Sequence, residues 1–314
     1  MSRHYVAGEF QRGRGPDEPA HVVVLGNEKG GSGKTTLSMH LVVHLLARGF
    51  RVATVDLDMR QRSLSRYVHN RVDWDARTRE RLAVPNHYEF APSQADLRSR
   101  ERAEDFGAMA AAIAEIEAEH DFVVIDTPGH DHHLMRLAHS MADTLVTPLN
   151  DSFVDFDVLG HVDPVTYELT EMGHYAAMVR QARRQRRAAD GGDMDWVVVR
   201  NRMSSLDTRN RQNLDHAMSQ LAMRLGFRTA AGIVERVIFR EFFPKGLTAL
   251  DTLDSGNGGR EPTVSHLAAR REIANLIRAL RLPTGEDARR RAEARAAFLE
   301  GPDDPGGLPD VFAD

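Results

Sequence analysis

The chain has 314 residues, of which 41% are hydrophobic and 6% aromatic, so it can bury a sizeable core made mainly of aliphatic side chains. Its formal net charge is −5 and it contains no cysteine, which excludes disulfides, thiolate zinc sites, iron–sulfur clusters and cysteine nucleophiles. No stretch approaches the ~18 uninterrupted apolar residues of a membrane span, and the first residues lack a signal-peptide pattern, so we expect a cytoplasmic protein.

Residues 1–20 are polar and rich in glycine and arginine, which predicts a flexible N-terminal arm. Strand-like and helix-like patterns then alternate. Short aliphatic runs predict buried strands at 21–25, 51–55, 122–125, 145–148 and 196–199. Apolar residues at helical spacing predict a helix from Lys34 to Arg48, closed by Gly49, and another around 108–116.

This alternation predicts an α/β fold with a mostly parallel, doubly wound sheet flanked by helices. We expect it to form one domain over residues 21–282. Residues 283–314 are polar and end in a stretch rich in proline, glycine and aspartate, so we expect a disordered tail.

A glycine-rich segment from Gly26 to Thr36 separates the first strand from the first helix, the context of a phosphate-binding P-loop. Glycines let the backbone N–H groups point at phosphate oxygens, and the helix N-terminus adds positive potential. Two of the chain's three lysines lie here, Lys29 and Lys34, and Glu28 stands where the ordinary pattern has glycine. We expect the nucleotide to contact Gly30, Gly31, Ser32, Gly33, Lys34, Thr35 and Thr36, with Lys34 on the β- and γ-phosphates and Thr35 on Mg²⁺.

Acidic residues end two further strands. Asp56 and Asp58 follow the second strand, and Asp126 ends the hydrophobic run that starts at Val123, in a Walker B arrangement. Because carboxyl ends of parallel strands face the ligand crevice, we expect these acids near the loop, although a simple strand-terminal turn is the alternative for Asp56 and Asp58. Asp126 is predicted to hold the hydration shell of Mg²⁺, with residues 127–129 sensing the γ-phosphate as a switch.

Three histidines and an acid follow this switch at residues 130–133. Adjacent residues diverge around a helix instead of converging on one metal ion. We therefore expect a solvated loop at a helix N-terminus.

The loop K-G-G-x-G-K-T-T resembles the deviant Walker A signature, and the chain is similar to the ParA/MinD superfamily of nucleotide-switched ATPases. The resemblance implies ATP and Mg²⁺ as cofactors and a homodimer that sandwiches two ATP molecules. It implies that Lys29 reaches across the interface to the partner's ATP, that Asp58 orients or deprotonates the attacking water, and that Asp56 supports the loop and metal shell. Asn201 would read adenine, with Arg202 stacked beside it. The candidate catalytic residues are Asp58, Lys29 and Lys34.

The absence of cysteine excludes the nitrogenase iron protein and the cluster scaffolds of this superfamily. Residues 286–300 present mostly alanine on their apolar side, too weak for a MinD-type membrane helix, so no membrane partner is expected. Several stretches instead resemble the MipZ-like division-site regulators, although His130 stands where that group has a second glycine. They are residues 26–29, 56–62, 150–157, 162–166, 195–198, 201–202, 209–211 and 242–244.

This closer resemblance implies that an ATP dimer binds nucleoid DNA without sequence preference and blocks polymerisation of the tubulin-like FtsZ. The monomer would be recruited by ParB, which gives a nucleoid-associated and polar distribution. Residues 180–240 supply a physical basis for DNA binding, because they hold thirteen arginines and six acids in a chain of negative net charge. Candidate contacts are Arg209 and Arg211, and then Arg202, Arg224 and Arg228. Arg183, Arg184, Arg186 and Arg187 fit a solvated helix end equally well.

Two other functions share the phosphate loop. A ParA-type partition ATPase would also bind ATP and DNA, but it would move cargo instead of inhibiting FtsZ. A metabolic P-loop enzyme that activates a small acid would need a substrate pocket and no DNA.

Overall fold

The computed structural model describes residues 20–89, 98–163, 165–204, 208–251 and 263–283. For residues 98–106, 190 and 208–211 it describes the backbone only. Residues 1–19 of the predicted arm (1–20) and residues 284–314 of the predicted tail (283–314) therefore lie outside the described residues.

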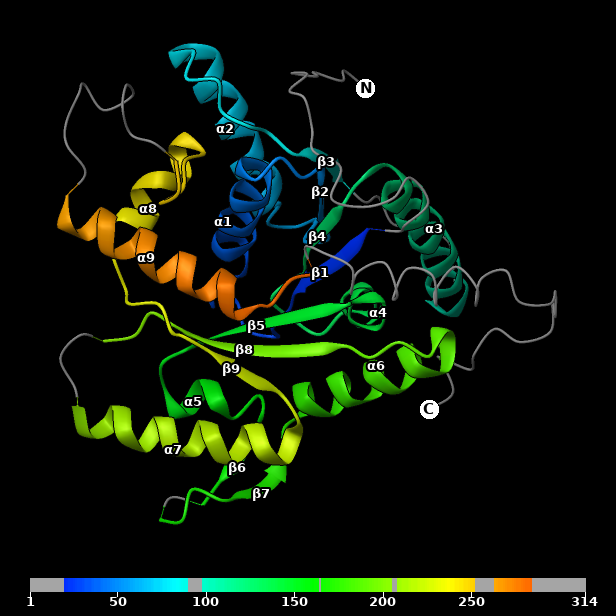
Figure 1. The fold of residues 1–314 in the computed structure, drawn as a ribbon. Coiled ribbons are helices and arrows are strands. Elements are labelled where there is room, and N and C mark those ends of the chain that lie inside the picture. The colour runs from blue at the N-terminus through cyan, green and yellow to red at the C-terminus, as the bar shows by residue number, and fades with distance from the viewer. Residues whose placement is uncertain (1–19, 90–97, 164, 205–207, 252–262, 284–314) are drawn as a thin grey trace.

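A seven-stranded, entirely parallel sheet runs through the centre of the molecule (Figure 1). This confirms the predicted fold class, a mostly parallel sheet flanked by helices, with two strands more than the five that were predicted. Its strand order is β3-β2-β4-β1-β5-β8-β9. The strands are β1 (His21–Leu25), β2 (Val52–Asp56), β3 (Asn86–Glu89), β4 (Phe122–Asp126), β5 (Thr144–Asn150), β8 (Asp195–Asn201) and β9 (Arg228–Ala230).

Helices cover both faces of this sheet (Figure 1). One face carries α1 (Lys34–Ala47), α2 (Ser63–Thr78), α8 (Ile238–Phe242), the 3₁₀ turn η1 (Phe243–Lys245) and α9 (Val264–Ala279). The other carries α3 (Arg98–Glu119), α4 (His133–Met141), α6 (His174–Asp190) and α7 (Thr208–Leu225). The short α5 (Phe153–Phe156) follows β5.

The central strand β1 explains why its sequence is an unbroken apolar run. Val22 and Val24 face the core shared with α3, α4, α6 and α7, whereas Val23 and Leu25 face the core shared with α1 and α9. A parallel strand covered on both faces has no solvent side, so alternation of polar and apolar residues is absent.

The structure also contains an antiparallel hairpin that the sequence did not indicate, β6 (Gly160–Val162) and β7 (Leu169–Met172). Strands of three and four residues are too short for a periodic signal. Tyr167, in its turn, stacks on Phe153 of α5 with ring centroids 5.9 Å apart and meets His216 of α7 edge-on at 5.8 Å. The hairpin therefore connects α5 with α7 through side-chain rings.

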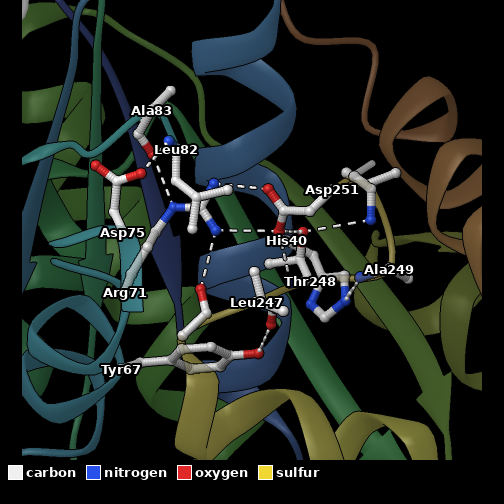
Figure 2. A network of polar contacts seen from close by, with 12 residues as sticks. His40, Tyr67, Arg71, Asp75, Leu82, Ala83, Leu247, Thr248, Ala249 and Asp251 are labelled. Carbon is white, nitrogen blue, oxygen red and sulfur yellow. Dashed lines mark hydrogen bonds and ion pairs between the residues drawn. The ribbon is translucent and has the colours of Figure 1, made fainter. Parts of the chain in front are cut away.

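Helix α2 is anchored by Arg71, which is 1% exposed (Figure 2). Its guanidinium donates two bonds to the Asp251 carboxylate, at 3.0 and 2.7 Å, and further bonds to the carbonyls of Gly246 and Ala83. Gly246 has φ 63°, and a Cβ at this position would lie 2.0 Å from the backbone nitrogen of Arg71, so only glycine fits. Removing one partner of such a buried pair costs about 3–5 kcal/mol. Because α2 begins directly after the loop that carries Asp58, this anchor also fixes one end of that loop.

Within the described residues, none of the helices combines the length and the apolar character needed to cross a lipid bilayer.

We expect acid to destabilise this fold between pH 6.5 and pH 4. Burial lowers the pKa of His40, His87 and His139 to about 4, so these residues are neutral in the folded chain and take up protons on unfolding in this window. Each histidine should remove about 2 kcal/mol from the free energy of unfolding between pH 7 and pH 5. Burial raises the pKa of Asp126 to about 7, so the folded chain takes up a proton at this carboxylate as the pH falls. This uptake stabilises the folded chain and offsets the destabilisation from roughly one histidine.

Urea unfolding at pH 7 and pH 5 measures this change. His87→Gln should reduce the pH dependence by about 2 kcal/mol. Equal stability at the two pH values would contradict the assignment of buried neutral histidines.

Candidate nucleotide site

The carboxyl ends of all seven parallel strands lie at one edge of the sheet. β1 lies between β4 and β5, where the order of the strands reverses, and this is the position at which open α/β sheets bind ligands. The register places Asp56 beside Asp126 and Asn150 beside Asn201. The predicted acids and Asn201 are therefore brought to the same edge as the phosphate loop.

Two glycines give the phosphate loop its shape. Gly31 has φ 73° and Gly33 has φ 98°, in the left-handed region that other residues rarely adopt. A Cβ on Gly33 would lie 2.2 Å from Nδ2 of Asn201, and this Nδ2 donates a hydrogen bond of 2.8 Å to the carbonyl of Ser32. Asn201 thus braces the loop from β8, in addition to lying where the resemblance expects an adenine reader.

The two lysines of the loop have different surroundings. Lys34 is buried, and its Nζ donates to the carbonyls of Asn27 and Lys29, both at 3.1 Å. Burial lowers the pKa of Lys34, and the negative charges of Asp126 and Asp58 oppose this decrease. Lys29 is 33% exposed, and its Nζ donates to the carbonyl of Val154 and lies 3.5 Å from Oδ1 of Asp155. Lys34 therefore faces its own loop, whereas Lys29 lies at its outer edge against α5.

Asp126 and Thr35 form a close pair beneath the loop. Thr35 Oγ1 donates to Oδ2 of Asp126 at 2.5 Å, and Ser38 Oγ lies 3.4 Å from Oδ1. Burial raises the pKa of Asp126 to about 7, although the bond from Thr35 opposes this rise. A hydroxyl and a buried carboxylate side by side are the oxygen donors that suit a hydrated Mg²⁺.

Asp56 and Asp58 are used mainly to shape the loop between β2 and α2. Asp56 is buried and accepts from both the N–H and the hydroxyl of Ser65, at 2.9 and 3.0 Å, and from the N–H of Asp58. Burial raises its pKa, and these hydrogen bonds oppose the rise. Asp58 accepts from the N–H of Gln61 and is partly exposed. Asp56 is therefore suited to support the loop between β2 and α2, and the partly exposed Asp58 can contact solvent.

The predicted switch lies against the phosphate loop. Thr127 donates through Oγ1 to the carbonyl of Leu25 at 2.8 Å, and a Cβ on Gly129 would be 2.9 Å from the Cα of Gly30. His132 caps α4 by accepting from the N–H of Leu134. In the part of the chain that the structure describes, no three histidine or acidic groups are placed to hold a metal ion, so the histidines after the switch do not form such a site.

These features fit a bound nucleotide. Ser32 Oγ is buried and has no hydrogen-bond partner among the described residues. The space beside Gly30 and Gly31 is open, because a Cβ at either position would meet no atom within 4 Å. A buried ammonium at Lys34 adds the charge that polyphosphates require. ATP, when bound here, supplies the phosphoanhydride bond that is hydrolysed. Lys34 and the loop amides are the groups that would hold its phosphates, and Asp58 is the carboxylate that would orient a water molecule.

The candidate DNA contacts are distributed unevenly. Arg202 and Arg224 are exposed and form no ion pair with another described residue, and Arg202 has a left-handed backbone with φ 53°. Arg228 instead donates two bonds to Asp195 and others to the carbonyls at the end of α9, so its guanidinium joins β8 to α9. Arg209 and Arg211 belong to the first turn of α7, and their side chains lie outside the described set.

The sequence analysis did not identify two residues that contact the site, Asp155 and Tyr175. Asp155 lies in the stretch 150–157 that carried the family resemblance, but nothing in its spacing connected it with Lys29. Tyr175 donates to the carbonyl of Gly26 from 149 positions away, and no local pattern marks such a contact.

The loop between β1 and α1, the acid that ends β4 and the doubly wound parallel sheet together define a P-loop nucleotide-binding protein. Residues 21–284 match the family model described as ATPase MipZ. The chain belongs to this family of ATPases.

Solved structures show the same fold. A variant of McdA from Cyanothece, in an ATP complex, is 15% identical, and the match covers 84% of this chain and 96% of that one with a TM-score of 0.52. The septum site-determining protein MinD of Pyrococcus horikoshii OT3, with Mg-ADP, is 17% identical over 83% and 96%, also with a TM-score of 0.52.

A curated relative from Rhizobium rhizogenes carries the name replication protein A. It is 27% identical over 170 residues, which is 44% of this chain and 42% of the relative. The chain thus matches less than half the length of this relative.

We expect Lys34→Ala to lower ATP affinity at least roughly a hundredfold, because it removes a charge-assisted contact from a buried position. Titration with a fluorescent ATP analogue measures the affinity. Lys245→Ala removes the same charge beside Trp74 of α2 and should bind ATP as the unmodified chain does. Similar losses in both variants would show that Lys34 does not contact the phosphates.

Proposed function

We propose that the chain is an ATP-dependent dimerisation switch that positions the division site. In this proposal its ATP dimer binds nucleoid DNA without sequence preference and inhibits FtsZ polymerisation, and its monomer is recruited by ParB. The protein would then be cytoplasmic, associated with the nucleoid and concentrated at the poles. The family match, which names an ATPase, supports the nucleotide cycle on which the proposal depends.

The observation that carries the proposal is the placement of Lys29. A lysine that served its own phosphate pocket would point inward as Lys34 does, but Lys29 is partly exposed at the loop edge and bonds to α5. A charge in this position can reach a triphosphate bound to a second copy, which would couple nucleotide binding to dimerisation in the manner of an arginine finger.

Mg²⁺ is proposed as the metal of this cycle. The adjacent Thr35 and Asp126 would hold it, Asp126 through water, with Asp56 supporting the shell. The solved MinD relative contains Mg-ADP, and another solved relative is a MinC:MinD cell division complex from Aquifex aeolicus. These relatives support a metal-dependent nucleotide and a protein partner for this chain.

The proposed DNA surface lies on α7 and at the end of β8. Most arginines of the segment 180–240 are engaged elsewhere, for example Arg186 with Asp143 and Arg236 with Glu272. Among the described side chains of this segment, Arg202 and Arg224, like Arg180 and Arg184 of α6, are exposed and form no ion pair with another described residue. The proposal assigns the phosphate contacts to Arg209, Arg211, Arg202 and Arg224. Two subunits would double this small number of contacts, so dimerisation would control DNA affinity.

Asp58→Ala should bind ATP, hydrolyse it slowly and accumulate as a dimer, because the loop that positions water is impaired while both lysines are intact. Adding Lys29→Ala should return the protein to a monomer that still binds ATP. Size-exclusion chromatography with light scattering, with and without ATP, measures the mass. An ATP-saturated Asp58→Ala monomer would defeat the switch, and equal loss of ATP affinity in the Lys29→Ala and Lys34→Ala variants would show that Lys29 acts in its own subunit.

Arg209→Ala combined with Arg211→Ala should weaken binding to all duplexes alike and flatten the salt dependence by about 0.9 in log–log slope for each lost phosphate contact. Fluorescence anisotropy across a salt series, in the Asp58→Ala background with ATP, measures both. Arg180→Ala combined with Arg184→Ala removes the same charge from exposed positions of α6 and is the matched control. Equal effects of the two pairs would indicate a general charge effect and not a DNA face on α7.

Co-sedimentation with polymerising FtsZ separates this proposal from a partition ATPase. The ATP dimer should reduce the amount of FtsZ in the pellet, whereas a ParA-type motor would leave it unchanged. Stimulation of turnover by a small acid, without DNA or protein, would favour a metabolic enzyme instead.

A further inference from the structure

Tyr175, in the first turn of α6, reaches the start of the phosphate loop from inside the core. Its side chain is fully buried. The hydroxyl lies 2.8 Å from the carbonyl oxygen of Gly26, 3.0 Å from Nε2 of His139 and 2.9 Å from Oγ1 of Thr147. Gly26 belongs to the phosphate loop, and His139 to α4, the helix that follows the switch segment 127–129.

A count of protons shows that this cluster has one donor too few. Nδ1 of His139 lies 2.6 Å from the carbonyl of Met135, which can only accept, so Nδ1 carries the proton. Burial lowers the pKa of His139 to about 4, so the ring is neutral at pH 7 and its Nε2 is an acceptor. Thr147 Oγ1 accepts from Trp196 Nε1, and its own proton can go to the Tyr175 oxygen, so Thr147 does not need the proton of Tyr175. The single proton of Tyr175 therefore has two acceptors, Gly26 and His139.

The neighbouring residue contacts the same two segments at the surface. His174 Nδ1 lies 2.8 Å from Oε1 of Glu28 in the phosphate loop, and its Nε2 lies 3.9 Å from Oδ2 of Asp131, just before α4. The packing is also tight, because a Cβ on Gly26 would be 2.3 Å from Nε2 of His139. The start of α6 thus connects the phosphate loop with the segment leading into α4 both in the core and at the surface.

We propose that Tyr175 is a positioning residue of the ATP site, whose one hydroxyl proton is shared between the Gly26 carbonyl and Nε2 of His139. When the hydroxyl donates to Gly26, the start of the phosphate loop is held and Nε2 of His139 lacks a donor. When it donates to His139, α4 is held and the Gly26 carbonyl is released. A small displacement of α4 changes which acceptor is nearer, so the γ-phosphate signal can pass to the loop through this proton. The part given to α4 rests on the proposed switch at 127–129.

Tyr175→Phe tests this role, with Tyr67→Phe as the matched control. Tyr67 is also fully buried, and its hydroxyl donates to the carbonyl of Leu247 at 2.8 Å, on the opposite face of the sheet (Figure 2). Tyr67→Phe loses one buried hydrogen bond, whereas Tyr175→Phe loses its bonds to Gly26, His139 and Thr147, so Tm should fall in both variants and does not by itself test the role. The discriminating readout is the ratio of ATP to ADP affinity, measured with fluorescent analogues in the Lys29→Ala background so that dimerisation does not contribute.

Tyr175→Phe should change the ATP-to-ADP affinity ratio by about twofold to tenfold, the range of a single hydrogen bond, whereas Tyr67→Phe should not. In ¹⁵N spectra of the unmodified chain, His139 should be a neutral ring with the proton on Nδ1, and its Nε2 signal should differ between ADP and a non-hydrolysable ATP analogue. An unchanged ratio in Tyr175→Phe would overturn the proposal, as would a doubly protonated His139 at pH 7. Failure of Asp58→Ala to dimerise would defeat the proposed switch but would leave these two results standing.

Discussion

The nucleotide site depends on the position of one strand, β1. It is central in the sheet and fully buried, and its hydrogen bonds to β4 and β5 fix the point from which the phosphate loop leaves. The N–H of Gly26 bonds to Val146 of β5, and the carbonyl of Leu25 accepts from Thr127 beyond β4. Both neighbours therefore hold the start of the loop, and a shift of β1 by one residue would move the lysines, Thr35 and the contact with Asp126 together.

Charge in this protein is organised more by internal pairing than by surface distribution. Arg71, Arg186 and Arg200 are almost completely buried, and each bonds to an aspartate far away in the sequence. A planar guanidinium suits this use because it can satisfy a carboxylate and carbonyls at the same time. The cluster of arginines between residues 180 and 240 consequently contributes less positive surface than its composition indicates.

The part of the site that could be predicted from the sequence is the part encoded by local motifs. The phosphate loop, Asp126 and the parallel sheet each depend on residues close together in the chain, and the structure brings them to one edge as expected. β2 begins one residue later than predicted. The helix predicted around 108–116 is only a part of α3, because the ends of that helix are mostly charged and carry little apolar periodicity.

Contacts between distant segments could not be predicted in this way. Asp155 beside Lys29, and Tyr175 between Gly26 and His139, arise only when three or more elements pack together. Similarly, the number of arginines in a segment says nothing of partners such as Asp143 or Glu272, which lie outside it. The role of Arg228 in joining β9 to α9 is of this kind.

The two outermost strands of the sheet are its shortest. β3 has four residues and β9 has three, so each offers few unpaired N–H and C=O groups to a neighbouring molecule. Long exposed edge strands are the usual templates for sheet extension and aggregation. A chain that accumulates locally at high concentration would gain from such edges, because they discourage copies from joining strand to strand and leave association to the loops at the carboxyl ends of the strands.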